Sequence, residues 1–225
     1  MPKTAVIVQA RLGSTRLPAK VLLPLPTGRT VLEEVLFRCK QIPGVDVVVC
    51  AIPDTAENDT LCAHIMASSW GHGNVLSTFR PVVVRGPEHD VLARYAKAAE
   101  AVNADVIMRV TSDCPLIDPE ACGQVLRRRS EGGYAYACNN MPPTFPIGLD
   151  TEAFTIGILR YANETATDPL DREHVTPMMR RLAAGADGIN VASEVDRSYL
   201  RWTLDTLEDY QVIWSRFEHE MGKTA

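Results

Sequence analysis

The sequence predicts an α/β protein whose sheet is mostly parallel and has helices on both faces. Short apolar runs rich in β-branched residues alternate with amphipathic helical patterns through about the first 130 residues. A strand that is joined by a helix to the next strand implies parallel pairing with a right-handed crossover. The 225 residues, 46% of them hydrophobic, suffice for one domain with a sizeable core. The expected architecture is therefore a doubly wound, Rossmann-like fold.

The first predicted strand, 4–8, is a short apolar run, as expected of a strand that is buried on both faces. After a loop rich in Gly and Pro, Thr30 and Glu33 form a capping box that opens a helix over 31–41. Further strands are predicted at 46–52, 82–84 and 105–110, and further helices at 57–69, 88–103 and 119–131. Ligands of such sheets bind beyond the carboxyl ends of the strands, so the loops after the first and fourth strands are of interest.

The regular alternation ends near residue 133. Strands are predicted at 134–138 and 148–154, on either side of the Pro-rich stretch 141–146. The remaining elements are a helix from 156, a helix with Asp171 as its N-cap, a strand at 189–192, a short run at 200–204 and a closing helix capped by Thr206. We expect one domain over 1–225, with 134–200 as an irregular β/α insertion.

Charge is distributed unevenly along the chain. The formal net charge is −5, yet residues 1–40 carry seven Lys or Arg and only two Glu. An acidic protein with a basic N-terminal segment is a poor candidate for nucleic-acid binding and a better one for holding a small anion.

The cysteines and the apolar segments indicate the compartment. Six cysteines are scattered without a CxxC pair, which favours reduced, mostly buried thiols over a metal site or a disulfide framework. No apolar run is long enough to span a membrane, and the N-terminal run is too short for a secretion signal. We expect a cytoplasmic protein.

The loop after the first strand concentrates positive charge. Arg11, Arg16 and Lys20 lie within ten residues, and Gly13 and Ser14 between them allow backbone amides to turn inward. Three cations at this edge of a parallel sheet can neutralise a triphosphate. The loop matches neither the Walker pattern nor the GxGxxG pattern, and a solvated surface loop is the alternative.

Six motifs, in order along the chain, resemble those of a known family. They are QARLGSTRLPAKVL, RGPEHDVLARY, RVTSDCPLIDP, PIGLDTEAF, REHVTP and RWTLDTLEDYQVI. Together they resemble the sugar-acid cytidylyltransferases, which activate 3-deoxy-manno-octulosonate and acylneuraminate with CTP, and in particular the branch named after spore coat polysaccharide biosynthesis protein F. The resemblance implies a sheet of the nucleotide-diphospho-sugar transferase type. Ala19 and Ser112 depart from it, since the family usually has Gly at both positions, and Ala19 would be strained at a positive φ.

The resemblance also implies the nucleotide site. Arg11, Lys20 and Asp113 are the expected catalytic residues. The expected nucleotide contacts are Ala10, Arg11, Leu12, Gly13, Ser14, Arg16, Lys20 and Ser112.

Two carboxylates are candidates for binding Mg²⁺, which needs one or two protein carboxylates and fills its other positions with phosphate oxygens and water. Asp113 ends the fourth strand, and the resemblance makes Asp205 the second ligand. From its position alone, Asp205 is also a candidate helix cap.

The acceptor side is less clearly marked. The resemblance places Asp150, Arg172 and His174 near a small acidic acceptor and assigns 134–200 to acceptor binding and a homodimer contact. The alternative for His174 is an ordinary helix-face residue with local partners.

The expected reaction is transfer of CMP from CTP to a sugar acid with release of pyrophosphate, in the synthesis of surface-polysaccharide or glycan precursors. A different acceptor, such as a phosphonate or a sugar phosphate, is one alternative. A non-catalytic nucleotide-binding protein of the same fold is another. A glycosyltransferase is disfavoured because Ser112-Asp113-Cys114 has one carboxylate where such enzymes usually show a DxD motif.

Overall fold

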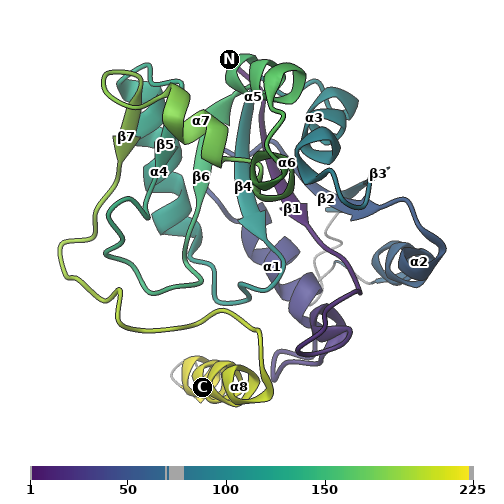
Figure 1. Cartoon of the computed structure of the whole chain (residues 1–225). Helices are drawn as coiled ribbons and strands as arrows, with labels where there is room; N and C mark the ends of the chain where they lie inside the picture. The colour runs from purple at the N-terminus through teal and green to yellow at the C-terminus, as the bar shows by residue number, and fades with distance from the viewer. Residues whose placement is uncertain (1, 69, 71–78, 223–225) are drawn as a thin grey trace.

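A seven-stranded sheet forms the centre of this computed structural model, which describes residues 2–68, 70 and 79–222 (Figure 1). The strand order is β3-β2-β1-β4-β6-β5-β7. The strands are β1 (Thr4–Gln9), β2 (Val47–Pro53), β3 (Val82–Gly86), β4 (Val106–Thr111), β5 (Tyr136–Cys138), β6 (Glu152–Thr155) and β7 (Gly188–Asn190). Strands β1 to β4 pair in parallel, whereas β6 runs antiparallel to both β4 and β5. The predicted mostly parallel α/β fold is confirmed.

Helices cover both faces of the sheet. They are α1 (Val31–Lys40), α2 (Asp59–Ala67), α3 (Val91–Ala101), α4 (Pro119–Glu131), α5 (Ile156–Thr165), α6 (Pro169–His174), α7 (Pro177–Leu182) and α8 (Leu207–Gly222), with 3₁₀ turns η1 (Lys20–Leu22) and η2 (Ala56–Asn58). None of these described helices combines the length and the apolar character that crossing a membrane requires.

The central strand β1 is buried on both faces. Val6 and Val8 pack with residues of α1, α2 and α4, whereas Ala5 and Ile7 pack with residues of α3, α5 and α7. Successive side chains of a strand point to opposite faces, so this one apolar run contributes to two cores.

The C-terminal helix α8 lies below the sheet, apart from the helices that cover its faces (Figure 1). Ile213 and Phe217 of α8 pack in a third cluster with Leu25, Val31 and Leu204, among others. As predicted, Thr206 caps the helix, since its Oγ1 accepts a hydrogen bond from the Asp209 amide at 3.3 Å. This packing brings the end of the chain to the loop that follows β1.

Several predicted boundaries were wrong. The strand predicted from 148 begins only at Glu152, because the side-chain amide of Asn139 occupies the backbone there: its Nδ2 donates to the Leu149 carbonyl and its Oδ1 accepts from the Thr151 amide, both at 2.8 Å. The short run at 200–204, for which no element type was predicted, has one isolated bridge, between Ile147 and Arg201.

The helix predicted to open at Asp171 begins at Pro169. Asp168 is its N-cap, with the Leu170 amide 2.9 Å from its carboxylate, and Asp171 is buried inside the helix, where it accepts from Arg181. The helix predicted over 88–103 is α3, shorter at both ends, with Asp90 as its N-cap. The helix predicted over 57–69 is η2 followed by α2, and its last predicted residue, Ser69, lies outside the described residues.

Candidate active site

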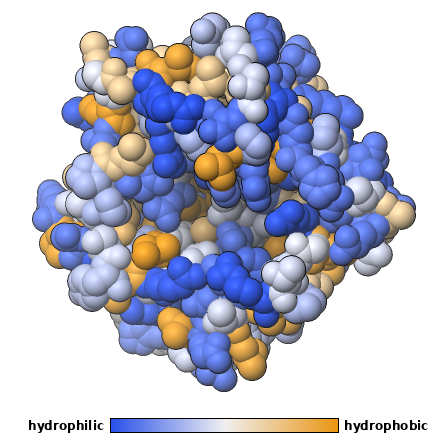
Figure 2. All heavy atoms as spheres, in the orientation of Figure 1, coloured by the Kyte–Doolittle hydropathy of each residue, from blue (hydrophilic) through white to orange (hydrophobic). Residues whose placement is uncertain are grey.

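A polar pocket of about 500 Å³ opens at the carboxyl ends of β1 and β4. Its walls come from the loop after β1, the loop after β4, the start of α3, the end of α6 and Asp205. Figure 2 shows a hollow in the middle of this face, bordered mostly by hydrophilic side chains. The two loops that the sequence singled out therefore meet in one pocket.

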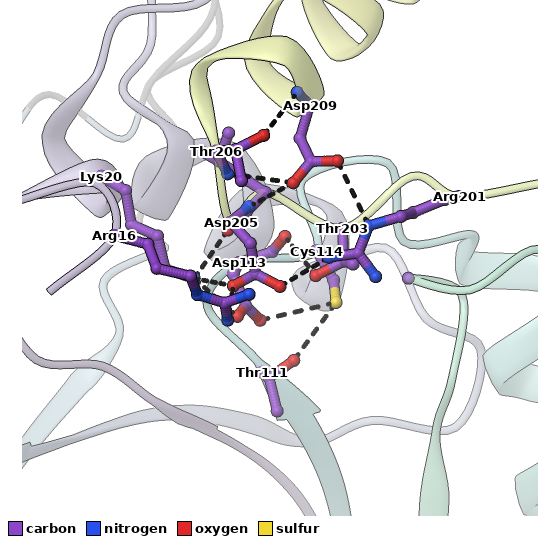
Figure 3. Close-up of polar contacts among 12 residues, drawn as sticks. Arg16, Lys20, Thr111, Asp113, Cys114, Arg201, Thr203, Asp205, Thr206 and Asp209 are labelled. Atoms are coloured by element: carbon purple, nitrogen blue, oxygen red, sulfur yellow. Dashed lines mark hydrogen bonds and ion pairs between the residues drawn. The ribbon is translucent and has the colours of Figure 1, made fainter. Parts of the chain in front are cut away.

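Lys20 connects Asp113 and Asp205, the two carboxylates that the family resemblance assigned to a metal (Figure 3). Its Nζ donates to Asp113 Oδ2 and to Asp205 Oδ1, each at 2.9 Å, and to the Leu204 carbonyl at 2.6 Å. Burial alone would lower the pKa of Lys20, but Asp113 and Asp205 outweigh that effect and raise it. Lys20 thus stays charged, and it holds three separate segments of the chain together.

Asp205 is held by cations on both of its oxygens. Arg16 lies 2.9 Å from Oδ1, and Arg201 donates to Oδ2 at 2.6 Å. Burial alone would raise the pKa of Asp205, but hydrogen bonding and charge from Lys20, together with Arg201, lower it overall. The Asp205 amide donates to Asp209 Oδ2 at 2.9 Å, so α8 positions this carboxylate through its first turn.

The loop between β1 and η1 is shaped by its own backbone and by one buried side chain. The Leu12 amide donates to Asn58 Oδ1 at 3.0 Å, and the amide of Ala19 donates to the Leu12 carbonyl at 3.3 Å. Ala19 adopts the left-handed conformation, with φ +52°, at the start of η1. The strain that the sequence predicted for a non-glycine residue there is present, at a cost of about 1 kcal/mol.

Most of the predicted nucleotide contacts line the pocket. Those that do are Ala10, Arg11, Gly13, Ser14, Arg16, Lys20 and Ser112. Leu12 does not, because its side chain packs against the core beneath the loop.

Of the three residues predicted to contact the acceptor, one lines the pocket and two do not. His174 lines the pocket. Arg172 does not, because it pairs through two nitrogens with Asp90, the N-cap of α3, and donates to the Asn163 carbonyl at 2.7 Å. Asp150 accepts a hydrogen bond from the Gly148 amide at 3.0 Å, in the turn before β6, and is also not part of the pocket lining.

A family model described as Cytidylyltransferase matches residues 5–213. The chain belongs to the cytidylyltransferase family. The resemblance drawn from the six motifs is thereby confirmed.

Two of the relatives found match nearly the whole chain, and a third matches 61% of it. Spore coat polysaccharide biosynthesis protein SpsF of Bacillus subtilis (strain 168) is 33% identical over 221 residues, which is 94% of this chain and 85% of that protein. A cytidylyltransferase structure from Leptospira borgpetersenii serovar Hardjo-bovis is 30% identical, with a TM-score of 0.86, and the match covers 97% of this chain and 88% of that one. A 3-deoxy-manno-octulosonate cytidylyltransferase of Anaeromyxobacter sp. (strain Fw109-5) is 33% identical over 139 residues, 61% of this chain and 50% of that protein.

The donors in the pocket suit a metal ion that arrives with a nucleotide. Among the described residues, no three His, Cys, Asp or Glu side chains are grouped so that they could hold a metal ion. Asp113 and Asp205 nevertheless converge on one cation, the ammonium of Lys20. Two carboxylates match what Mg²⁺ takes from a protein when phosphate oxygens and water complete its coordination, and they do not match a closed zinc site.

Sequence reasoning missed several residues of the site. Arg94, Glu88, His89 and Glu173 line the pocket, and Arg201 and Asp209 position Asp205. All six lie within the quoted motifs, but a charged residue in a helix or a loop is typical of a solvent-exposed surface, and no spacing signal sets these apart.

Proposed function

We propose that this member of the cytidylyltransferase family transfers CMP from CTP to a sugar acid, with Mg²⁺, and releases pyrophosphate. The observation that carries the proposal is the ammonium of Lys20 between Asp113 and Asp205, beneath a loop with two further cations, Arg11 and Arg16. Such a site can bind a triphosphate and stabilise the negative charge that develops as its terminal phosphates leave.

In the proposed reaction, an acceptor oxygen attacks the α-phosphorus in line with the bond to the β-phosphate. For a sugar acid this oxygen is the anomeric hydroxyl, whose proton is released to solvent. A bond forms between that oxygen and phosphorus, and the bond from phosphorus to the bridging oxygen breaks, with pyrophosphate as leaving group. Arg11, Arg16 and Lys20 hold the phosphates, so catalysis is mostly positioning and neutralisation of charge.

Asp113 and Asp205 are the residues that would hold Mg²⁺. When bound, the ion would neutralise phosphate charge and polarise the reacting phosphoryl group. Asp113 faces the pocket from the end of β4, and Asp205 faces it from the segment before α8.

We assign the acceptor to the side of the pocket that 134–200 provides. His174, at the end of α6, is the proposed acceptor contact. Arg172 is proposed as a positioning residue, because its ion pair with Asp90 fixes α6 against α3. We also propose that the chain forms a single domain and that Asp150 lies near the bound acceptor. A homodimer formed through 134–200 and a cytoplasmic location complete the proposal.

Pyrophosphate release tests the function. The protein is assayed with each of the four common ribonucleoside triphosphates, with and without Mg²⁺, against sugar acids that include 3-deoxy-manno-octulosonate and acylneuraminate. We expect release with CTP and a sugar acid only when Mg²⁺ is present. Release with a phosphonate or a sugar phosphate instead would change the acceptor but keep the reaction. Folded protein that binds CTP and releases nothing with any acceptor would refute catalysis.

A further inference from the structure

Arg94 is a buried cation without an acidic partner. It lies at the N-terminal end of α3, and 2% of its surface is exposed. Its Nη1 donates to the Pro87 carbonyl at 3.1 Å, whereas its Nε is buried without a hydrogen-bond partner. No carboxylate in the part of the chain that the structure describes lies within ion-pair distance of this side chain.

Two half-buried arginines of the described chain have acidic partners, since Arg109 is paired with Glu152 and Arg38 with Glu34. Arg129, which is buried like Arg94, donates to the Tyr134 carbonyl and does not line the pocket. A buried charge is costly unless it is paired, and Arg94, unlike Arg129, lines a pocket from which a ligand can supply the missing counter-ion. Burial lowers the pKa of the Arg94 guanidinium, and the charge of nearby Arg11 acts in the same direction, whereas Tyr95, Cys50 and Glu88 act against it.

Local backbone makes room for this side chain. A Cβ on Gly86, the last residue of β3, would lie 3.1 Å from Cγ of Arg94 and 3.3 Å from its Cβ. Glycine at the end of β3 thus allows the arginine stem to pass close to the strand, while the Pro87 carbonyl fixes one end of the guanidinium.

The cations that line the pocket form two groups. Arg16 and Lys20 are already paired with Asp205 and Asp113. Arg11 and Arg94 line the same pocket, and neither has an ion pair with any described residue. Glu88 and Glu173 also line the pocket, but neither forms an ion pair with Arg11 or Arg94, so these two arginines are its described cations without an ion-pair partner.

We propose that Arg94 and Arg11 form an oxyanion-binding subsite of this pocket, separate from the Lys20 cluster, that holds a phosphate or carboxylate group of a substrate. Arginine suits this task because its planar fork donates two parallel hydrogen bonds to either kind of group. Which substrate carries the anion rests on the proposed function: the terminal phosphates of CTP or the carboxylate of the acceptor.

Isothermal titration calorimetry tests the subsite on the full chain. The probes are pyrophosphate, CTP, cytidine and 3-deoxy-manno-octulosonate, measured without metal and again with Mg²⁺. The variants are Arg94→Gln and Arg94→Lys. The matched control is Arg129→Gln, because Arg129 is also buried, donates to the Tyr134 carbonyl and does not line the pocket.

We expect Arg94→Gln to weaken binding of at least one anionic probe about tenfold or more, with cytidine unchanged, because charge-assisted hydrogen bonds are lost. Weaker pyrophosphate and CTP binding assigns the subsite to the phosphates. Weaker sugar-acid binding alone assigns it to the acceptor. Arg94→Lys keeps the charge without the fork and is expected to give a smaller loss, and Arg129→Gln none.

Thermal unfolding separates this role from a structural one. Removal of an unpaired buried charge is expected to leave the melting temperature of Arg94→Gln unchanged or raised, whereas an arginine that only supports the fold would lower it. Wild-type affinity of Arg94→Gln for all three anionic probes would overturn the subsite, even if CTP turnover is intact. If Arg94→Gln does not fold, undiminished binding by Arg94→Lys overturns it. A subsite that binds pyrophosphate through Arg94 in a protein that does not turn over CTP would leave the inference standing and refute the proposed function.

Discussion

The ammonium of Lys20 lies 2.9 Å from the carboxylate of Asp205, which stands 185 residues further along the chain. Asp113, 93 residues from Lys20, meets the same ammonium at the same distance. The charge proposed to stabilise a departing pyrophosphate and the carboxylates proposed to hold a metal ion therefore form one connected cluster. Changes to any one member should affect the other two.

Lys20→Ala should lower kcat/KM for CTP by about 10²- to 10³-fold, because a preorganised charge at the phosphates is lost. Steady-state pyrophosphate release measures this effect. The matched control is Lys40→Ala, at the exposed end of α1, which should behave as wild type. Activity of Lys20→Ala within twofold of wild type would contradict the assignment.

Asp113→Asn should abolish Mg²⁺-dependent turnover while the fold persists, because the amide keeps the shape of the side chain and loses its charge. Activity is measured over a series of Mg²⁺ concentrations, with circular dichroism to monitor folding. Asp187→Asn changes an exposed carboxylate away from the pocket and serves as control. Full activity of Asp113→Asn at low Mg²⁺ would rule out its role in metal binding.

Glu152 lies outside the pocket and is the centre of a second cluster of charged side chains. This carboxylate is 1% exposed, and it accepts from Tyr136, Arg180 and Arg109. Burial alone would raise its pKa, but the two arginines outweigh that effect and lower it. Glu152→Gln should cost about 3 kcal/mol of unfolding free energy at neutral pH, because the half-buried Arg109 and Arg180 lose their shared, fully buried partner.

The pH dependence of that effect follows from the sign of the shift. A carboxylate with a lowered pKa in the folded state contributes its full stability above its unfolded value, here 4.5, and loses it as the pH falls through the folded value. The difference in unfolding free energy between wild type and Glu152→Gln, measured with urea, should therefore become smaller below pH 4.5. The control, Glu131→Gln on the surface of α4, should have the same unfolding free energy as wild type. A difference for Glu152→Gln that stays constant down to pH 3 would contradict the argument.

Arg172→Ala should raise the KM for the acceptor several-fold and leave the KM for CTP nearly unchanged, because the ion pair with Asp90 holds the helix that carries His174. Asp90→Asn should have a similar effect, and the double variant should be no worse than either single one. Arg160→Ala, on the exposed side of α5, is the control. Additive losses in the double variant would show that the two residues act separately.

The parallel half of the sheet could be predicted from sequence because its strands and helices have strong, long periodic patterns. The cation-rich loop after β1 could also be found, since charge and position there agree. Asp205 could be placed with Asp113 only through the family resemblance, because nothing local indicates a contact across 92 residues of sequence. Arg94 was missed because burial of an arginine depends on the space beside Gly86, which is set by tertiary packing. The prediction of a strand over 148–151 was wrong for a similar reason, because the side-chain amide of Asn139 takes the backbone hydrogen bonds of Leu149 and Thr151.

The packing of α8 determines when the cluster of Lys20, Asp113 and Asp205 can form during synthesis. Asp205 reaches Lys20 only once the segment before α8 is in place, and that segment is held by Ile213 and Phe217 against Leu25 and Leu204. These residues follow all seven strands in the sequence, so a ribosome makes them after the whole sheet. A nascent chain can therefore fold its central strands early, yet it lacks a complete cluster until α8 has been made.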